Sequence, residues 1–204
     1  MDAFTTLTAT AAPLYVANVN TDIITPMQYI VGTSPDSMGE IAFMPWRFNE
    51  DGSENPDFVL NKEPFRDAQI LIAGPNFACG SSRESAVWAL KGLGIRAVIA
   101  PSFGGIFANN CYQSGILPVV LPDEVVAGFV RQAEAAPHTA TFTVDLENCV
   151  VIPPQGEAVP FAADNLRRAA LLEGLDDLGM TKRRHSEIVS FQESDRKSRP
   201  WIYR

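Results

Sequence analysis

The sequence has few of the residues that build disulfide frameworks or metal centres. Its 204 residues include three cysteines and two histidines. The cysteines are widely spaced and form no Cys-x-x-Cys pair, which argues against a disulfide scaffold, a zinc site or an iron–sulfur cluster held by this chain alone. A reducing compartment fits this cysteine usage best. We expect Cys79 and Cys111 to be small buried residues, although a position near a helix start could lower the pKa of Cys79.

Positive charge is also scarce, with 16 Lys and Arg against 24 Asp and Glu, a net charge of -8. A broad nucleic-acid or anionic-membrane surface needs the opposite sign, so neither partner is expected. No apolar run reaches the ~18 residues of a membrane-spanning helix. Residues 1–13 lack the positive n-region of a signal peptide. We therefore expect a cytoplasmic protein, in which one cationic pocket could still bind a small anion.

The remaining composition is that of a folded protein, with 46% hydrophobic and 20% charged residues. A chain of this length buries about 70% of its unfolded surface and needs no disulfide or metal to fold. We expect a single domain over residues 1–204, with a core at about 14–160 and a C-terminal helical extension at about 164–204.

Short apolar segments alternate with helical ones in the middle of the chain, which predicts an α/β fold with a parallel sheet. Pro118 argues for a sheet edge, and Asp123 is a plausible helix cap. The predicted strands are 68–73, 96–100 and 116–121, and the predicted helices are 84–92, 106–112 and 123–135.

The flanking segments are less regular. Residues 26–64 combine many helix breakers with aromatic residues and predict a packed, irregular excursion. Further elements are expected as a strand at 14–17, a hairpin of 139–145 with 149–153, a helix at 164–173 capped by Asp164 and stopped by Gly174, and a polar helix at 181–196.

The most informative stretch is NFACGSSRE, residues 76–84, between a buried strand and a helix. Small residues allow close approach of a ligand, and the amides and dipole of a helix start bind anions. Gly-Ser-Ser before a helix is as often simple capping by Ser81 or Ser82. Arg83 favours the anion site, because a cation in the first turn is disfavoured by about 0.3–1 kcal/mol and calls for an anionic partner. Its guanidinium also suits a carboxylate.

Rival motifs fit less well. The stretch has neither the Gly-x-Gly-x-x-Gly of dinucleotide sites nor the Gly-Lys-Ser/Thr of a P-loop. A Ser-His-Asp hydrolase needs a histidine, but His138 and His185 lie in polar or proline-flanked segments and are expected at the surface. Arg47 is also expected at the surface or an interface.

Several motifs together resemble the small subunit of 3-isopropylmalate dehydratase, the swivelling-domain half of an aconitase-type hydro-lyase. NFACGSSRESA (76–86) is similar to the family's Asn-Phe-Gly-Cys-Gly-Ser-Ser-Arg-Glu-His-Ala, and NTDIITP (20–26) to its Asp-Thr-Asp-x-Ile-Ile-Pro. Residues 46–61, 98–122 and 171–181 match as well, so the resemblance covers nearly the whole chain. It implies a β/β/α swivelling domain with a compact barrel-like sheet core flanked by helices.

The resemblance also implies roles for individual residues. Ser81 would be the general base that removes a proton from the carbon next to a carboxylate. Ser82 and Arg83 would bind substrate carboxylates, and Asp22 with Thr21 would belong to the same site. The implied site residues are catalytic Ser81, Arg83 and Asp22, and substrate-binding Ser82, Thr21, Gly80, Ile30 and Val31.

Ile30 and Val31 lie in the loop that, in this superfamily, contacts the variable group of the substrate. Their apolar side chains suit an isopropyl group, but filling the core explains them equally well. The family interconverts 2- and 3-isopropylmalate through isopropylmaleate in leucine biosynthesis and uses a [4Fe–4S] cluster with an open iron. Because this chain lacks closely spaced cysteines, the cluster is expected on a separate large subunit. The C-terminal helices, with Trp201 and Tyr203, are candidate partner surfaces.

Some positions depart from the family patterns, since Ser85 replaces His, Ala78 replaces Gly and Asn20 replaces Asp. They leave open a paralogous hydro-lyase for another small dicarboxylate, of the 2-methylmalate, citraconate or dimethylmalate type. They also leave open a non-catalytic subunit that only stabilises its partner.

Overall fold

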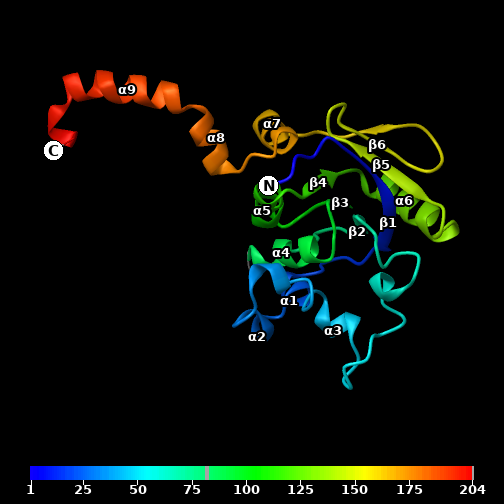
Figure 1. The fold of residues 1–204 in the computed structure, drawn as a ribbon. Coiled ribbons are helices and arrows are strands. Elements are labelled where there is room, and N and C mark those ends of the chain that lie inside the picture. The colour runs from blue at the N-terminus through cyan, green and yellow to red at the C-terminus, as the bar shows by residue number, and fades with distance from the viewer. Residues whose placement is uncertain (81–82, 204) are drawn as a thin grey trace.

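The computed structural model describes residues 1–80 and 83–203. At its centre is a seven-stranded sheet with the strand order β4-β3-β2-β1-β5-β6-β7 (Figure 1). The strands are β1 (Thr6–Leu14), β2 (Ile70–Ala73), β3 (Ala97–Ala100), β4 (Leu117–Val120), β5 (Thr141–Asp145), β6 (Val150–Ile152) and β7 (Val159–Pro160).

Strand β1 joins a parallel and an antiparallel half of this sheet. Its second part pairs parallel with β2, with Ala11 opposite Ile70, and β3 and β4 continue the parallel half. Its first part pairs antiparallel with β5, with Thr6 opposite Asp145, and β6 and β7 follow. The predicted α/β class, the edge position of the Pro118 strand and the hairpin are thereby confirmed.

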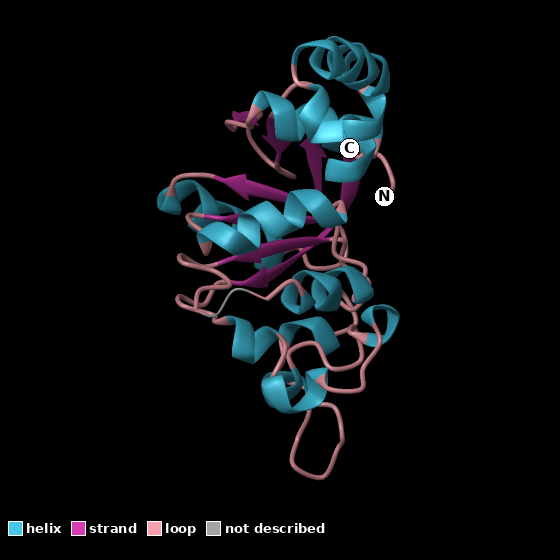
Figure 2. Cartoon of the chain, turned by 90° about the vertical axis from the view of Figure 1, so that its left-hand side faces the viewer, coloured by secondary structure: helices cyan, strands magenta, loops and turns pink. Residues whose placement is uncertain are grey.

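The helices between the strands cover both faces of the parallel half, and Figure 2 shows them packed against the strands. The helices are α1 (Thr21–Ile24), α2 (Met27–Ile30), α3 (Met44–Arg47), α4 (Ser85–Gly92), α5 (Gly105–Ser114), α6 (Asp123–Ala135), α7 (Asn165–Glu173), α8 (Asp177–Arg183) and α9 (His185–Ser198). Short 3-10 turns lie at Pro35–Ser37, Val59–Asn61 and Pro200–Tyr203.

Alternate residues of each central strand enter two different cores. Leu71 and Val98 lie in a core with α4, α5 and the 38–65 segment. Ile70 and Ile99 lie in a core with α6, the hairpin and α7. Since both faces are covered, these strands are apolar without alternation, as is usual in parallel sheets.

The structure corrects three predicted elements. The first strand is Thr6–Leu14 and not 14–17, because this Thr- and Ala-rich segment is paired on both sides and the chain leaves the sheet after Leu14. Asp123 is not a cap but the first residue of α6, and its Oδ1 accepts the Tyr15 hydroxyl at 2.6 Å. The predicted 181–196 helix is two helices, divided at Arg184.

Helix α7 forms as predicted. Asp164 Oδ1 accepts the amides of Leu166 and Arg167, both at 3.0 Å, and Gly174 ends the helix with a φ of +67°. The N-terminal segment is tied to the same helix, since the Phe4 amide donates to the Leu171 carbonyl at 2.9 Å.

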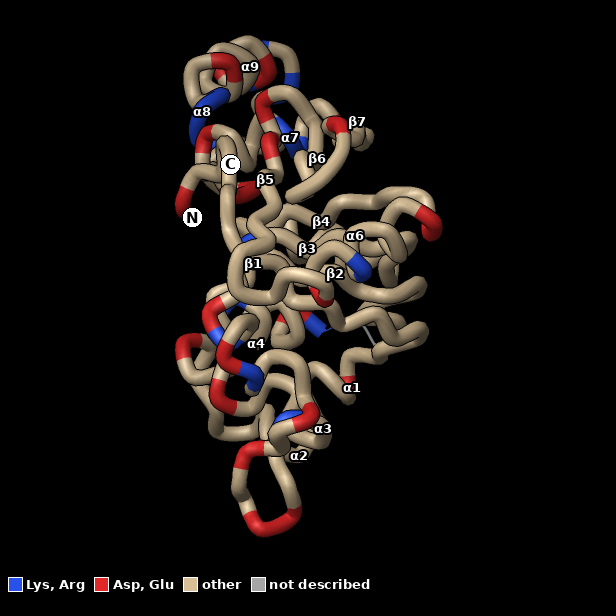
Figure 3. The backbone as a smooth tube through the Cα atoms, turned by 90° about the vertical axis from the view of Figure 1, so that its right-hand side faces the viewer, with Lys and Arg blue, Asp and Glu red and all other residues tan. Residues whose placement is uncertain are grey.

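Beyond α7, the helices α8 and α9 extend away from the sheet (Figure 1). Basic and acidic residues both lie on this extension, with Lys182 and Arg183 at the end of α8 and Glu187 in the first turn of α9 (Figure 3). Asp195 orders the tip of this extension by accepting hydrogen bonds from Arg199 Nε at 2.6 Å and the Tyr203 hydroxyl at 2.9 Å. Across the described part of the chain, no helix has both the length and the apolar character to cross a bilayer.

Candidate functional site

Three loops meet where the parallel strands β1, β2 and β3 end. The first loop follows β1, the second follows β2 and the third follows β3. The Thr21 amide donates to the Cys79 carbonyl at 3.0 Å, which joins the first loop to the second. The Phe77 amide donates to the Ser102 carbonyl at 3.0 Å, and the Gly104 amide to the Phe77 carbonyl at 2.9 Å, which joins the second to the third. Ligands of α/β proteins bind at this end of the strands.

The second loop has an unusual backbone. Asn76, Ala78 and Gly80 all have a positive φ, of +57°, +55° and +89°. The loop also packs closely on its neighbour, since a Cβ at Gly104 would lie 2.4 Å from the Ala78 carbonyl oxygen. Left-handed residues outside glycine store strain, and such strain concentrates at functional sites.

A salt bridge joins the first two loops. Arg83 Nη1 donates to Asp22 Oδ1 at 2.8 Å and to the Thr25 carbonyl oxygen at 3.3 Å. The Arg83 side chain is 15% exposed and that of Asp22 57% exposed, so the carboxylate faces outward. Arg83 Nε is buried and has no hydrogen-bond acceptor within residues 1–80 and 83–203. A buried donor of this kind can bind an acceptor supplied from outside these residues.

Arg83 lies outside the helix, which corrects the predicted first-turn position. Helix α4 begins at Ser85 with Glu84 at its N-cap. The dipole argument was therefore wrong, and the anionic partner observed is the Asp22 carboxylate of another loop. The predicted base Ser81 and carboxylate-binding Ser82 lie outside the described residues.

Asp22 and Thr21 begin the short helix α1. Thr21 is buried, and Asn20 caps the helix by accepting the Ile23 amide at 2.9 Å. Asn20 stands where the family pattern has aspartate, and its side-chain oxygen serves as the helix cap. Gly80 lies beside it, since a Cβ there would be 3.6 Å from the Asn20 Cβ. Asp22, Thr21, Gly80 and Arg83 are therefore brought together by neighbouring loops.

Ile30 and Val31 lie at the end of α2, the next helix along the chain. Ile30 is half-buried and packs on the first core, whereas Val31 is 87% exposed. Filling the core therefore accounts for Ile30 but not for Val31. The exposed valine is available for contact with a ligand or a partner.

Known proteins match nearly the whole of this chain. The family model of the Aconitase C-terminal domain matches residues 1–124, and the model described as LeuD_N matches residues 130–164. The 3-isopropylmalate dehydratase small subunit of Roseobacter denitrificans is 48% identical over 202 residues, covering 99% of this chain and 100% of that protein. The Gluconobacter oxydans protein of the same name is 49% identical over 202 residues, covering 99% of this chain and 96% of that protein. The chain belongs to the 3-isopropylmalate dehydratase small subunit family.

A solved structure confirms the fold that the motifs implied. The crystal structure of 3-isopropylmalate dehydratase from Methanocaldococcus jannaschii matches with a TM-score of 0.66 and 24% identity, covering 91% of this chain and 99% of that one. The names of the curated relatives do not favour a paralogue for another dicarboxylate.

The structure also shows what two departures from the family pattern do. Ala78 adopts the left-handed conformation that favours the family's glycine. Ser85, in place of histidine, is buried at the start of α4, and its hydroxyl lies 3.4 Å from Thr25 Oγ1. Thr25 was missed by the sequence analysis, because a threonine before a proline carries no distinctive signal by itself.

The remaining predictions are partly confirmed. His138 and His185 are exposed, and Cys111 is fully buried, which raises the pKa of its thiol. Cys79 is partly exposed, so its predicted burial was wrong.

Arg47 is half-buried. Its Nη1 donates to the Gly39 carbonyl at 2.9 Å, and burial lowers the pKa of the guanidinium. The 26–64 excursion covers part of this side chain, and the predicted surface or interface position stays a prediction.

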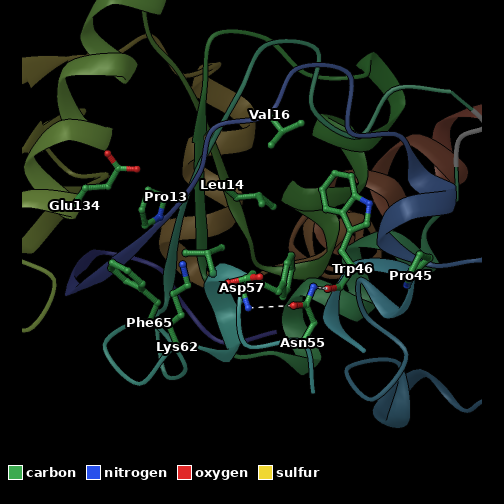
Figure 4. A pocket seen from close by; sticks show the side chains of 12 residues that line it. Pro13, Leu14, Val16, Pro45, Trp46, Asn55, Asp57, Lys62, Phe65 and Glu134 are labelled. Carbon is green, nitrogen blue, oxygen red and sulfur yellow. Dashed lines mark hydrogen bonds between the residues drawn. The ribbon is translucent and has the colours of Figure 1, made fainter. Parts of the chain in front are cut away.

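A large hollow is lined by residues other than the predicted site residues. It has a volume of about 540 Å³, and Figure 4 shows Leu14, Trp46 and Phe65 in its wall with Lys62 and Glu134 nearby. None of the predicted site residues lines it. Within the described residues, no three His, Cys, Asp or Glu side chains are placed to hold a metal ion.

Proposed function

We propose that this chain is the small subunit of a heteromeric hydro-lyase that interconverts 2-isopropylmalate and 3-isopropylmalate through isopropylmaleate in leucine biosynthesis. The observation that carries the proposal is the Asp22–Arg83 pair, held at 2.8 Å where the loops after β1 and β2 meet. This arrangement suits a dicarboxylate, because a guanidinium binds carboxylate oxygens through paired N–H donors. The family membership supplies the reaction.

In this proposal, Ser81 removes a proton from the carbon next to a substrate carboxylate. The hydroxide leaves the neighbouring carbon to give isopropylmaleate, and water then adds with the opposite placement of proton and hydroxyl. A serine hydroxyl is a poor base, and each pKa unit requires about 1.4 kcal/mol of differential stabilisation. A helix terminus contributes at most ~2 kcal/mol. Arg83 and backbone amides in a site without water must therefore contribute as well, as in an oxyanion hole.

Arg83 is also the proposed carboxylate ligand. Its Nη1 is occupied by Asp22 and the Thr25 carbonyl, which fixes the guanidinium plane, while its buried Nε has no acceptor within the described residues. A substrate carboxylate would satisfy that donor. Ser82, Thr21 and Gly80 are proposed to line the same position, and the apolar Ile30 and Val31 to contact the isopropyl group.

The site requires a second subunit. Asp22 is 57% exposed, so its surroundings are open to solvent in this chain alone. We propose that the large subunit closes the site and carries a [4Fe–4S] cluster, for which the described residues of this chain offer no ligand set. That cluster would supply the Lewis acid for the departing hydroxide. We place the complex in the cytoplasm, where the three free cysteines would remain reduced.

The C-terminal extension is the proposed contact with the large subunit. Leu178, Phe191, Trp201 and Ile202 are all more than half exposed on it. The bonds from Asp195 to Arg199 and Tyr203 hold the tip in one shape, so Trp201 is presented on an ordered turn. Exposed apolar groups on an ordered surface are typical of interaction sites.

The test is to mix the full chain with its large subunit and follow isopropylmaleate by its absorbance. Ser81→Ala should reduce turnover by about 10²–10⁴-fold, the range for loss of a general base. Ser37→Ala, in the turn Pro35–Ser37, is the matched control and should retain activity. Full activity of Ser81→Ala would exclude the mechanism, and normal activity of the large subunit alone would show that this chain only stabilises its partner.

A further inference from the structure

Two residues that depart from the family patterns touch each other. Thr25 stands where the pattern Asp-Thr-Asp-x-Ile-Ile-Pro has its second isoleucine, and Ser85 stands where the other pattern has histidine. Thr25 Oγ1 and Ser85 Oγ are 3.4 Å apart, and both residues are buried. Two hydroxyl groups from different loops thus meet in a buried place.

The hydroxyl pair has a defined direction. Thr25 Oγ1 donates to the Thr21 carbonyl at 3.3 Å, which uses its only proton. It can therefore only accept from Ser85, which donates. The chain of bonds runs from Ser85, the first residue of α4, through Thr25 to Thr21 at the start of α1. Each buried hydroxyl is satisfied by the next group, as buried polar groups require.

This chain of bonds is linked to the Asp22–Arg83 salt bridge through the Thr25 backbone. The carbonyl oxygen of Thr25 accepts from Arg83 Nη1 at 3.3 Å, and the same nitrogen binds Asp22. Ser85 follows Arg83 by two residues, and Thr25 follows Asp22 by three. The hydroxyl pair therefore joins the backbone that carries the arginine to the backbone that carries the aspartate.

We propose that Thr25 and Ser85 are positioning residues that hold the Arg83 guanidinium against Asp22 in the orientation that receives a substrate carboxylate. The proposal rests on the proposed function. Both hydroxyls are buried, and they act through the Thr25 carbonyl and through the placement of α4 relative to α1. Since Arg83 binds the substrate and Ser81 moves the proton, loss of the pair should raise KM more than it lowers kcat.

The first experiment uses the reconstituted complex. Thr25→Val keeps the shape of the side chain and removes its hydroxyl. Ser85→Ala removes the other hydroxyl. Thr25→Ser keeps a hydroxyl at position 25 and removes only the methyl group. Thr143→Val is the matched control, because Thr143 Oγ1 forms a 2.7 Å hydroxyl pair with Thr8 Oγ1 on strands β5 and β1, outside the site loops.

We expect Thr25→Val and Ser85→Ala to raise KM roughly three- to tenfold, the range of one hydrogen bond, with a smaller change in kcat. Thr25→Ser and Thr143→Val should keep the wild-type KM. The double variant Thr25→Val with Ser85→Ala should be no worse than the poorer single variant, because both remove one interaction. An unchanged KM in Thr25→Val, whether or not its Tm falls, would overturn the proposal.

A second measurement does not depend on turnover. Phenylglyoxal modifies accessible guanidinium groups, and peptide mass spectrometry reports the labelling of Arg83 separately. Arg83 should be labelled roughly threefold faster or more in Thr25→Val than in the wild type, and at the wild-type rate in Thr143→Val. Equal rates would overturn the inference. If the wild-type complex is inactive on isopropylmalate but Arg83 is still labelled faster in Thr25→Val than in the wild type, the proposed function is refuted and the positioning role is not.

Discussion

Arg83 Nη1 lies 2.8 Å from Asp22 Oδ1, although the two residues are 61 positions apart in the chain. The pair is possible because β1 and β2 run parallel and side by side, so that the loops after them leave the sheet at the same edge. The Arg83 guanidinium, on the loop after β2, is thereby held by the Asp22 carboxylate, which follows β1.

Replacement of Asp22 by asparagine should affect activity much more than stability. The carboxylate is more than half exposed, so the pair contributes only about 0.2–1 kcal/mol to folding. The guanidinium would lose its charged partner, and kcat/KM should fall by about 10–100-fold, the cost of 1.4–2.8 kcal/mol. Kinetics of the reconstituted complex and thermal unfolding of the chain measure the two effects.

The matched control is Glu54→Gln, which changes the surface pair of Glu54 with Arg66, at 2.9 and 2.7 Å. Its kcat/KM should equal that of the wild type. If Asp22→Asn retained full kcat/KM, the pair would have no part in the site.

Replacement of Ala78 by glycine should stabilise the chain. Ala78 has a φ of +55°, and a left-handed residue with a Cβ costs about 1–2 kcal/mol. The greater freedom of glycine in the unfolded chain opposes this by about 0.4–1 kcal/mol. The free energy of unfolding in urea should therefore rise by roughly 0.8 kcal/mol, the middle of the ~0–1.6 kcal/mol range that these two terms leave.

The same substitution at Ala108, inside helix α5, should have the opposite sign and destabilise by about 1 kcal/mol. A lower unfolding free energy for Ala78→Gly would mean that the left-handed conformation is not strained for alanine. The pair of variants thus separates backbone conformation from loss of a methyl group.

Replacement of Trp201 by alanine should weaken the complex without unfolding the chain. The side chain is 64% exposed, so its removal should leave Tm unchanged. If it contacts the large subunit, a buried aromatic at an interface contributes about 2 kcal/mol or more, and Kd should rise roughly 30-fold or more. Calorimetric titration with the large subunit measures this.

Val120→Ala serves as the control for Trp201, because Val120 is also an apolar residue that is more than half exposed but lies on the edge strand β4. Its Kd should be that of the wild type. An unchanged Kd for Trp201→Ala would remove the tip of the extension from the interface.

The sequence predicted the elements whose cause is local. The apolar runs at β2 and β3, the Asp164 cap and the Gly174 stop each depend on residues within a few positions, so the central α/β alternation and α7 could be recognised directly. The family motifs also predicted that Asp22 and Arg83 belong to one site, and the structure brings the two side chains into contact. Ser81, their proposed companion, stays a prediction.

Relationships between distant segments could not be read in the same way. The Thr- and Ala-rich strand Thr6–Leu14 forms because β2 and β5 lie on its two sides. Arg47 is half-buried because the 26–64 segment folds around it. The partner of Arg83 and the meeting of Thr25 with Ser85 follow from the order of strands in the sheet. Local patterns carry propensities and caps, whereas hydrogen bonds across some 60 residues exist only after loop closure has brought the segments together.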